Sequence, residues 1–164
     1  MPRVAGVNVV AWLAATVVIY VIGMVIYGFT LTEVWGNEML KNHGLAAPDA
    51  PMLHGGALTA ELNKIPGALD PGRAYGLGLV ISLVTALGIC IAQRLMKPDG
   101  MGAALRNGFV LWFGFAATTL AYNVVYASNS RIILGIDMMH LFLDYLAASA
   151  VVFLIDGKAL RGET

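Results

Sequence analysis

The sequence has 164 residues and no net charge, and 59% of its residues are hydrophobic while only 12% are charged. A soluble domain has about twice that charged fraction, so the composition excludes an ordinary soluble protein. Without a basic surface for a phosphate backbone, nucleic acid is not an expected partner. The only cysteine, Cys90, allows neither an intramolecular disulfide nor a cysteine zinc cluster. The mean hydropathy of +0.76 therefore indicates a small integral membrane protein.

Four apolar stretches are long enough for the roughly 20 residues that cross a bilayer core. They predict helices over about 8–29, 74–95, 105–127 and 132–155. The first is far longer than the roughly 7–15 residues of a signal-peptide core, so we interpret it as a retained anchor. Because lipid offers backbone groups no water, each span should be helical. The expected fold is a single all-α membrane domain over residues 1–164, an antiparallel four-helix transmembrane bundle.

The first connection, over about 30–72, is much longer than the others and contains four prolines and several glycines. A loop of this length is either functional or poorly ordered. It holds His43 and His54 near Met39 and Met52, a combination that soft metals favour. No ligand pair recurs at a metal-site spacing, so we interpret these as scattered side chains of a solvated extramembrane loop and predict no metal.

Positive charge predicts the orientation of the bundle, because Lys and Arg concentrate on the cytoplasmic side. The six on the side of the termini are Arg3, Arg94, Lys97, Arg106, Lys158 and Arg161. The four on the other side are Lys41, Lys64, Arg73 and Arg131. We therefore expect a multi-pass protein with both termini in the cytoplasm.

Helices in lipid associate through small residues and interhelical hydrogen bonds, so stripes of such residues mark the packed faces. On the first span the stripe is Thr16, Tyr20, Gly23 and Tyr27, and on the second it is Gly78, Ser82, Thr85 and Ala92. On the third span the stripe is Gly108, Trp112, Phe115, Thr119, Tyr122, Asn123 and Tyr126. Most of these read as packing surface, but the polar atoms of Tyr20, Tyr27 and Asn123 need partners.

The fourth span carries Asp137, His140 and Asp144 at spacings of three and four, within an arc of about 60° on one face. Asp144 is about a dozen residues from each end of the span, near the bilayer midplane, whereas Asp137 lies close to an interface. An ionised carboxylate at that depth costs several kcal/mol, and no Lys or Arg lies inside a span to pair with it. Asp144 is therefore either hydrogen-bonded to His140 or held neutral by desolvation, and we expect the neutral acid.

Counting inward from the span ends predicts a polar pocket in the outer half of the bundle. Tyr20, Ser82, Thr85 and Thr119 fall at the depth of Asp144, while Tyr27, Tyr122 and Asn123 fall near Asp137 and His140. Three uses are open: a hydrogen-bond network that fixes helix register, a proton or ion relay, or a site for a ligand or prosthetic group. A haem usually needs a second axial ligand, and no other histidine lies in a span, so no cofactor is assigned.

The order of these motifs resembles a family of small bacterial membrane proteins, the domain of unknown function 1761. The matching residues are Gly23 and Tyr27 at the end of the first helix and Trp35 shortly after it, Trp112, Gly114, Phe115, Thr118 and Asn123 in the third helix, and Ile136, Asp137 and His140 in the fourth. The sequence departs from the family pattern at Ile26, where a Trp is usual, and at His140, where an aromatic is usual; Asp144 has no counterpart. The resemblance implies a bacterial inner-membrane protein and assigns no activity.

No nucleophile with a base and an orienting group can be assembled from these residues, so we predict no catalytic site and no enzyme. The expected function is an accessory or interaction subunit of a membrane assembly, since four short helices bury little surface alone. Its partners would be the lipid bilayer and other membrane subunits or further copies of itself. The alternative is a small transporter or proton-conducting protein using the Asp/His cluster of the fourth span.

Overall fold

The computed structural model describes residues 2–68, 71–127 and 130–163, and most of this part of the chain is helical. Its elements, in order, are β1 (Arg3–Val4), β2 (Val7–Asn8), α1 (Val9–Gly23), the π-helix η1 (Met24–Thr30), α2 (Thr32–Asn42), α3 (Gly55–Leu62), α4 (Pro71–Met96), α5 (Met101–Leu111), the π-helix η2 (Trp112–Ala117), α6 (Thr118–Ala127) and α7 (Arg131–Leu160). The all-α class expected from the sequence is confirmed.

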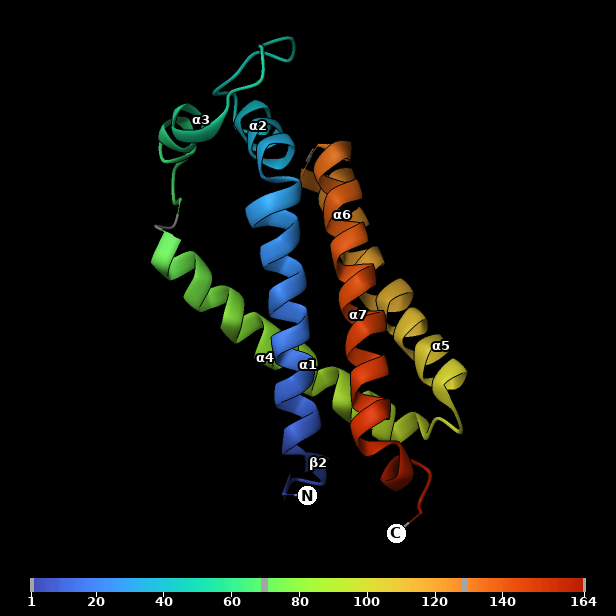
Figure 1. The fold of residues 1–164 in the computed structure, drawn as a ribbon. Coiled ribbons are helices and arrows are strands. Elements are labelled where there is room, and N and C mark those ends of the chain that lie inside the picture. The colour runs from blue at the N-terminus through green and yellow to red at the C-terminus, as the bar shows by residue number, and fades with distance from the viewer. Residues whose placement is uncertain (1, 69–70, 128–129, 164) are drawn as a thin grey trace.

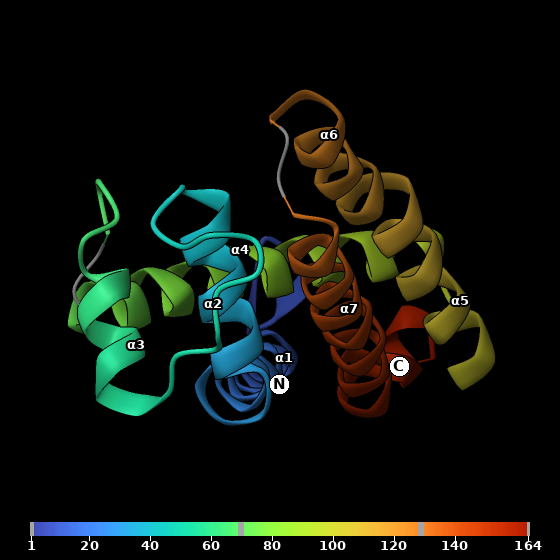
Figure 2. The same cartoon turned by 90° about the horizontal axis from the view of Figure 1, so that it is seen from above.

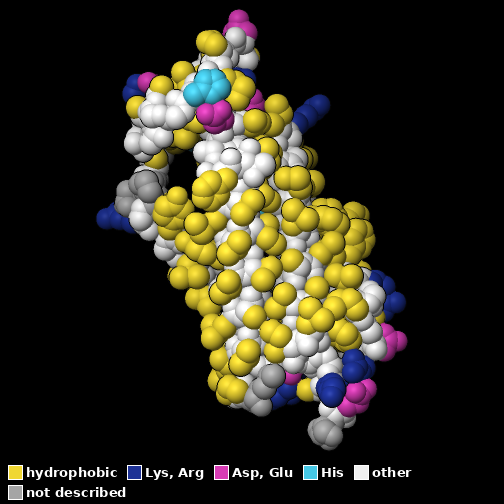
Figure 3. Space-filling view, viewed as in Figure 1, with side chains coloured by type: hydrophobic (Ala, Val, Ile, Leu, Met, Phe, Trp, Pro, Cys, Tyr) yellow, Lys and Arg dark blue, Asp and Glu magenta, His cyan; other side chains and the backbone are white. Residues whose placement is uncertain are grey.

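Four helical segments of the described chain are long and apolar enough to cross a membrane. They are Val9–Thr30, Gly72–Met96, Met101–Tyr126 and Arg131–Leu160. Figure 3 shows the apolar side chains covering the middle of one face, with charged side chains gathered toward its two ends. This distribution is the one that a bilayer imposes, with charges outside the hydrocarbon and apolar groups within it.

The two chain ends lie at the same end of the molecule, which we call the terminal side (Figure 1). Helices α1 and α7 run side by side, and α4 crosses behind them (Figures 1 and 2). Helices α5 and α6, joined through η2, lean against α7 from the other flank. Helix α7 therefore contacts each of the other three long segments.

The region expected as a loop over 30–72 contains two helices, and they lie at the end opposite the termini, which we call the α2 side (Figure 1). Asn37 of α2 donates to the Leu53 carbonyl at 2.9 Å and accepts from the Leu53 amide at 2.8 Å. This paired bond holds the segment before α3 against α2. The Cδ2 atom of Leu58 lies only 3.0 Å from where a Cβ at Gly36 would be, so α2 and α3 are closely packed.

Helix α2 is also bound to Ser130, the residue that precedes α7 and caps it. The Ser130 hydroxyl, which caps α7, donates to Glu38 Oε2 at 2.8 Å, and the Ser130 amide donates to Asn42 Oδ1 at 3.1 Å. Hydrogen bonds from Lys41 and then from Ser130 hold the pKa of Glu38 below its usual value. The α2 side is thus an ordered cap fixed to the start of α7.

Small residues allow α1, α4 and α7 to approach one another. Ala15, Ala86 and Ala148, one from each helix, are completely buried in a core that also includes Ile19, Ile89 and Val152. Small side chains at such crossings bring backbones close enough for dispersion contacts, which replace the hydrophobic effect inside lipid.

A polar network closes the terminal side. Arg3 binds Asp156 through both of its terminal nitrogens, at 3.1 and 2.5 Å, and Asn8 donates to Asp156 Oδ1 at 3.0 Å while its own Oδ1 caps the start of α1. Arg94 donates to the Ala5 carbonyl in the turn between β1 and β2. The N-terminal hairpin therefore links the first residues of α1 to the last turns of α4 and α7.

Two buried amides join α4 to α5 nearby. Gln93, with no exposed surface, donates to the Ala104 carbonyl at 2.8 Å and accepts from Asn107 at 3.2 Å. Buried amides with both groups paired add specificity at little cost, since neither group is left without a partner.

Glycine at position 108 sets the distance between α5 and α7. A Cβ added there would lie 2.6 Å from Ser149 Oγ and 2.8 Å from the Tyr145 carbonyl oxygen. The carbonyl belongs to the backbone of α7 and cannot rotate away. We therefore expect Gly108→Ala to separate the two helices and to lower stability by about 1–3 kcal/mol, the usual cost of overpacking.

Gly102→Ala is the matched control, because it lies in the same helix and a Cβ there meets nothing within 4 Å. It should leave the melting temperature in mild detergent unchanged or slightly higher, since Ala favours a helix. Equal melting of the two variants would contradict the close approach at Gly108.

A polar cluster between the first and last spans

The candidate site lies where the half of the first span nearer the α2 side faces α7. Asp137, His140 and Asp144 occupy one face of α7, as their spacing predicts. A Cβ at Gly23 would lie 3.2 Å from His140 Nε2, so the imidazole sits against the backbone of the first span. Absence of a side chain at Gly23 provides the space for His140.

Asp144 is the most deeply buried member, with 1% of its surface exposed. Its Oδ2 atom lies 3.0 Å from His140 Nε2. The two atoms are within ion-pair distance but are not aligned for a hydrogen bond, and within the described part of the chain neither carboxyl oxygen nor this ring nitrogen has a hydrogen-bond partner. A buried carboxyl without partners is costly, and such groups usually mark a functional position in a membrane span.

Tyr27, in η1, connects the pair to the third acidic residue. Its hydroxyl donates to Asp137 Oδ1 at 2.6 Å, and its ring meets His140 edge to face, with 4.9 Å between centroids. The other flank of the Tyr27 ring packs against Trp35 of α2 at 5.6 Å. Asp137, Tyr27, His140 and Asp144 thus form one cluster, which we call the polar cluster, and Trp35 lies on its α2 side.

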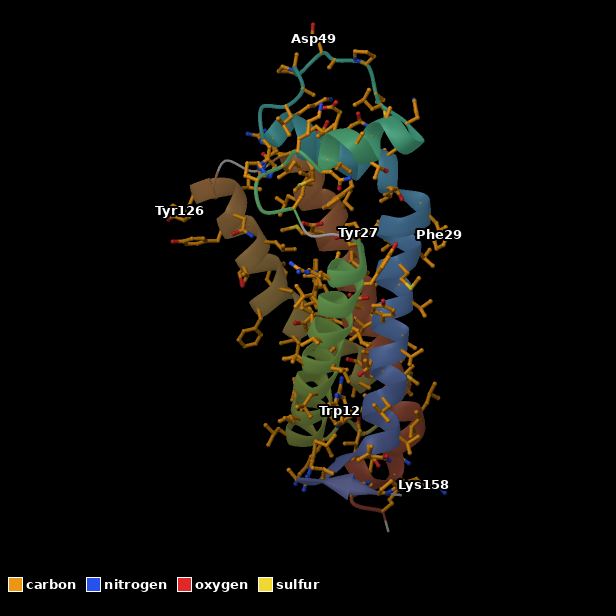
Figure 4. The ribbon with its side chains drawn as sticks, turned by 90° about the vertical axis from the view of Figure 1, so that its left-hand side faces the viewer. Trp12, Tyr27, Phe29, Asp49, Tyr126 and Lys158 are labelled. Carbon is orange, nitrogen blue, oxygen red and sulfur yellow. The ribbon has the colours of Figure 1, made fainter. Side chains whose placement is uncertain are left out.

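The bend from η1 into α2 is fixed locally. The Thr32 hydroxyl donates to the Tyr27 carbonyl at 2.6 Å, which binds the start of α2 to the π-helical turn. Figure 4 shows Phe29 pointing away from the helices, while Tyr27 lies among them.

Four of the residues expected in the pocket lie elsewhere. Tyr20 points to α4, where its hydroxyl meets the Tyr75 carbonyl at 3.4 Å. Thr119 and Asn123 are exposed, and Tyr122 is 60% exposed and packs on Tyr126, with ring centroids 4.1 Å apart. Figure 4 shows Tyr126 pointing outward. The stripe expected on the third span therefore does not face one neighbour: its later residues, from Thr119 on, are exposed.

The cause of this division is η2. An i→i+5 turn adds a residue to the helical repeat and rotates the following side chains by about 100° relative to an α-helix. Gly108 and Trp112, before or at the start of η2, contact α7, and Trp112 donates to the Met138 carbonyl at 3.1 Å. Beyond it, Ala116 and Ala117 are the buried positions and Thr119 faces outward.

Ser82 and Thr85 of α4 do not join the polar cluster through any hydrogen bond in the described residues. Ser82 is buried and donates to the Gly78 carbonyl within its own helix. Ser149, which sequence analysis did not single out, is completely buried and its hydroxyl has no partner among the described residues. Its position against Gly108 assigns it to the packing of α5 on α7.

The two histidines of the cap have different surroundings. His54 Nδ1 pairs with Glu33 Oε2 at 2.7 Å, and His43 is exposed at the end of α2. Within the residues that the structure describes, no three His, Cys, Asp or Glu side chains gather as metal ligands. A carboxyl beside an imidazole can, by contrast, hold a proton and pass it on.

The protonation of Asp144 can be tested by stability. If desolvation keeps the carboxyl neutral, Asp144→Asn retains its shape and a donor, and we expect little change in detergent melting. If Asp144 is ionised against His140, the same change strands an imidazolium and costs about 3–5 kcal/mol. His140→Phe and the double variant complete the cycle: marked destabilisation by both single changes with strong coupling would contradict the neutral acid.

Comparison with known proteins agrees with the resemblance seen in the sequence. The family described as "Protein of unknown function (DUF1761)" matches residues 10–153, which include all four long apolar segments in whole or in large part. No curated protein and no solved structure matches the chain. Because the match extends over most of its length, the chain belongs to the DUF1761 family of proteins of unknown function.

Proposed function

We propose that the chain is a non-enzymatic interaction subunit of the bacterial inner membrane, an antiparallel four-helix transmembrane bundle with both termini in the cytoplasm. The observation that carries this proposal is the exposed polar face of α6. Thr119, Tyr122 and Asn123 are all exposed there, within an apolar span. Polar side chains on the outside of a transmembrane helix favour contact with another helix.

Asn123 is the central residue of this face. Its carboxamide has no hydrogen-bond partner among the described residues, although neighbouring Thr119 donates to the Phe115 carbonyl. A carboxamide both donates and accepts, so Asn123 of one copy can pair with Asn123 of a second copy across a two-fold axis. The partner that this face fits best is therefore another copy of the same chain.

Low internal burial supports the same proposal. Over an 18-residue stretch of each of the four apolar segments, at most 28% of the positions are buried inside the chain. The third segment, which carries Asn123, has the lowest share, at 17%. The helices thus retain ample surface for neighbours as well as for lipid.

The test is the mass of the particle in mild detergent. We expect a multiple of the 17.4 kDa chain, shifting toward the monomer in Asn123→Leu because the intermolecular amide pair is lost. Phe113→Leu is the control, since Phe113 is exposed in η2 and carries no polar group. A monomer that co-purifies with no protein at any concentration would refute the proposal; a mixed particle with a different protein would refute only the choice of a second copy.

A second candidate function is supported by a different observation, the unpartnered Asp144 carboxyl beside His140. In this second candidate function, the chain transports protons, or an ion in exchange for protons, and the polar cluster is the binding site. In vesicles that contain a pH-sensitive dye, Asp144→Asn should abolish a proton flux carried by the wild type, whereas Ser149→Ala should retain it. A flux equal in wild type and Asp144→Asn would exclude this function.

A further inference from the structure

We propose that Asp144 exchanges its proton with the solution on the α2 side only, with His140 as the immediate acceptor. The proposal rests on the second candidate function and specifies which side the site is open to. It concerns access to one carboxyl, so it holds whether or not the chain associates with a second copy.

Polar groups continue from Asp144 toward the α2 side. His140 Nε2 is 3.0 Å from the carboxyl, and the His140 ring contacts Tyr27, whose hydroxyl binds Asp137. Asp137 lies six residues after Arg131, the first residue of α7, which places it about 9 Å along the helix from that end. The cluster therefore spans the distance between the buried carboxyl and the level of the cap.

Toward the terminal side, α7 has no acidic or basic residue between Asp144 and Asp156, and the buried Gln93 and Asn107 are bound to backbone or to each other. On the same face of α7, the residues that follow Asp144 toward the terminal side are Ala148 and Val152. They pack with Ile19 and Ala15 of α1 in the buried core. Thr16 of the same region donates to the Trp12 carbonyl of its own helix, and Ser149 faces Gly108. The next acid of α7, Asp156, is about 18 Å away along the helix and is already bound by Arg3 and Asn8.

The charged and titratable groups near Asp144 come from two elements. Asp137, His140 and Tyr145 belong to α7, and Tyr27 belongs to η1. On α4 no charged residue lies between Arg73 and Arg94, and α2 places Trp35 against Tyr27. In the described part of the chain, the basic side chains of α4 therefore lie near its two ends.

The exchange is a simple transfer. Because the two atoms are 3.0 Å apart but not aligned, the carboxyl or the imidazole first rotates into line. The Asp144 O–H bond then breaks, its proton binds the free electron pair of His140 Nε2, and a carboxylate and an imidazolium form. The imidazolium then releases its Nδ1 proton to a water molecule that enters from the α2 side, and the ring returns to its neutral form. A proton from solution follows the reverse route, so each full cycle restores every group.

Labelling by dicyclohexylcarbodiimide tests the proposal, because this lipid-soluble reagent forms a stable N-acylurea with protonated carboxyls inside membranes. Wild-type protein is reconstituted in vesicles, and the yield at Asp144 is followed by peptide mass spectrometry. A membrane-impermeant amine reagent reports orientation, since Lys41 and Lys64 lie on the α2 side and Lys97 and Lys158 on the terminal side.

We expect the labelling rate to fall when pH is raised from about 6 to about 9 on the α2 side, by about tenfold per pH unit once the carboxyl is mostly ionised. The same change on the terminal side should leave the rate within about twofold. His140→Phe should slow the response to a pH jump on the α2 side by at least about tenfold, since the proton acceptor is lost. Ser149→Ala, the matched variant on the other side of Asp144, should respond as the wild type does.

A response to pH on the terminal side, or on both sides equally, would overturn one-sided access even if the vesicles carried a proton flux. Absence of labelling at Asp144 at every pH would also overturn it, because the carboxyl would then not be a protonated group within reach of the bilayer. If the wild-type vesicles carry no proton flux but labelling of Asp144 still responds to pH on the α2 side alone, the transport function is refuted and the one-sided access of Asp144 is supported.

Discussion

Lipid offers no hydrogen bonds, so each polar group within the apolar part of this chain needs a partner in the protein or a path to one end. Helix α7 is where this constraint acts most strongly, since it carries Asp144 near its middle and contacts each of the other long segments. Ala148 and Ser149 lie next to the carboxyl and allow α1 and α5 to close around it. The same close packing that excludes lipid from Asp144 leaves His140 as the nearest group able to share its proton.

The two ends of the molecule satisfy the constraint in different ways. At the terminal side, Arg3, Asn8 and Asp156 form a paired network that joins the N-terminal hairpin and the start of α1 to α7, with both carboxylate oxygens of Asp156 bound. On the α2 side, the polar groups lead inward instead, from Asp137 through Tyr27 to His140. The two ends of the molecule therefore differ in their chemistry. The polar groups of the terminal side are bound to one another, whereas the Asp144 carboxyl, which is connected to the α2 side, has no hydrogen-bond partner in the described residues.

The sequence was sufficient to predict the four apolar segments and the shared face of Asp137, His140 and Asp144, because these depend on hydropathy and on the regular repeat of a single α-helix. It was not sufficient for side chains that follow an irregular turn: Thr119 and Asn123 were expected beside the cluster and lie outside it beyond η2. The two helices of the 30–72 region were not predicted, since their packing depends on Asn37 binding a backbone segment that is 16 residues away in sequence. Gln93 and Asp156 gave no signal because a polar residue near a span end is normally solvated.

The π-helical turns also explain how the site is assembled. Tyr20 and Tyr27 are seven residues apart, and in a continuous α-helix their side chains would share a face. In the structure Tyr20 points to the α4 carbonyl of Tyr75, whereas Tyr27, inside η1, donates to Asp137 of α7. The added residue in η1 thus turns one tyrosine from α4 to α7 and places it against both His140 and Trp35. π-Turns cost some backbone hydrogen bonding and are often found at functional sites. Here the turn has an identifiable consequence: without it, the hydroxyl that links Asp137 to the His140–Asp144 pair would face a different helix.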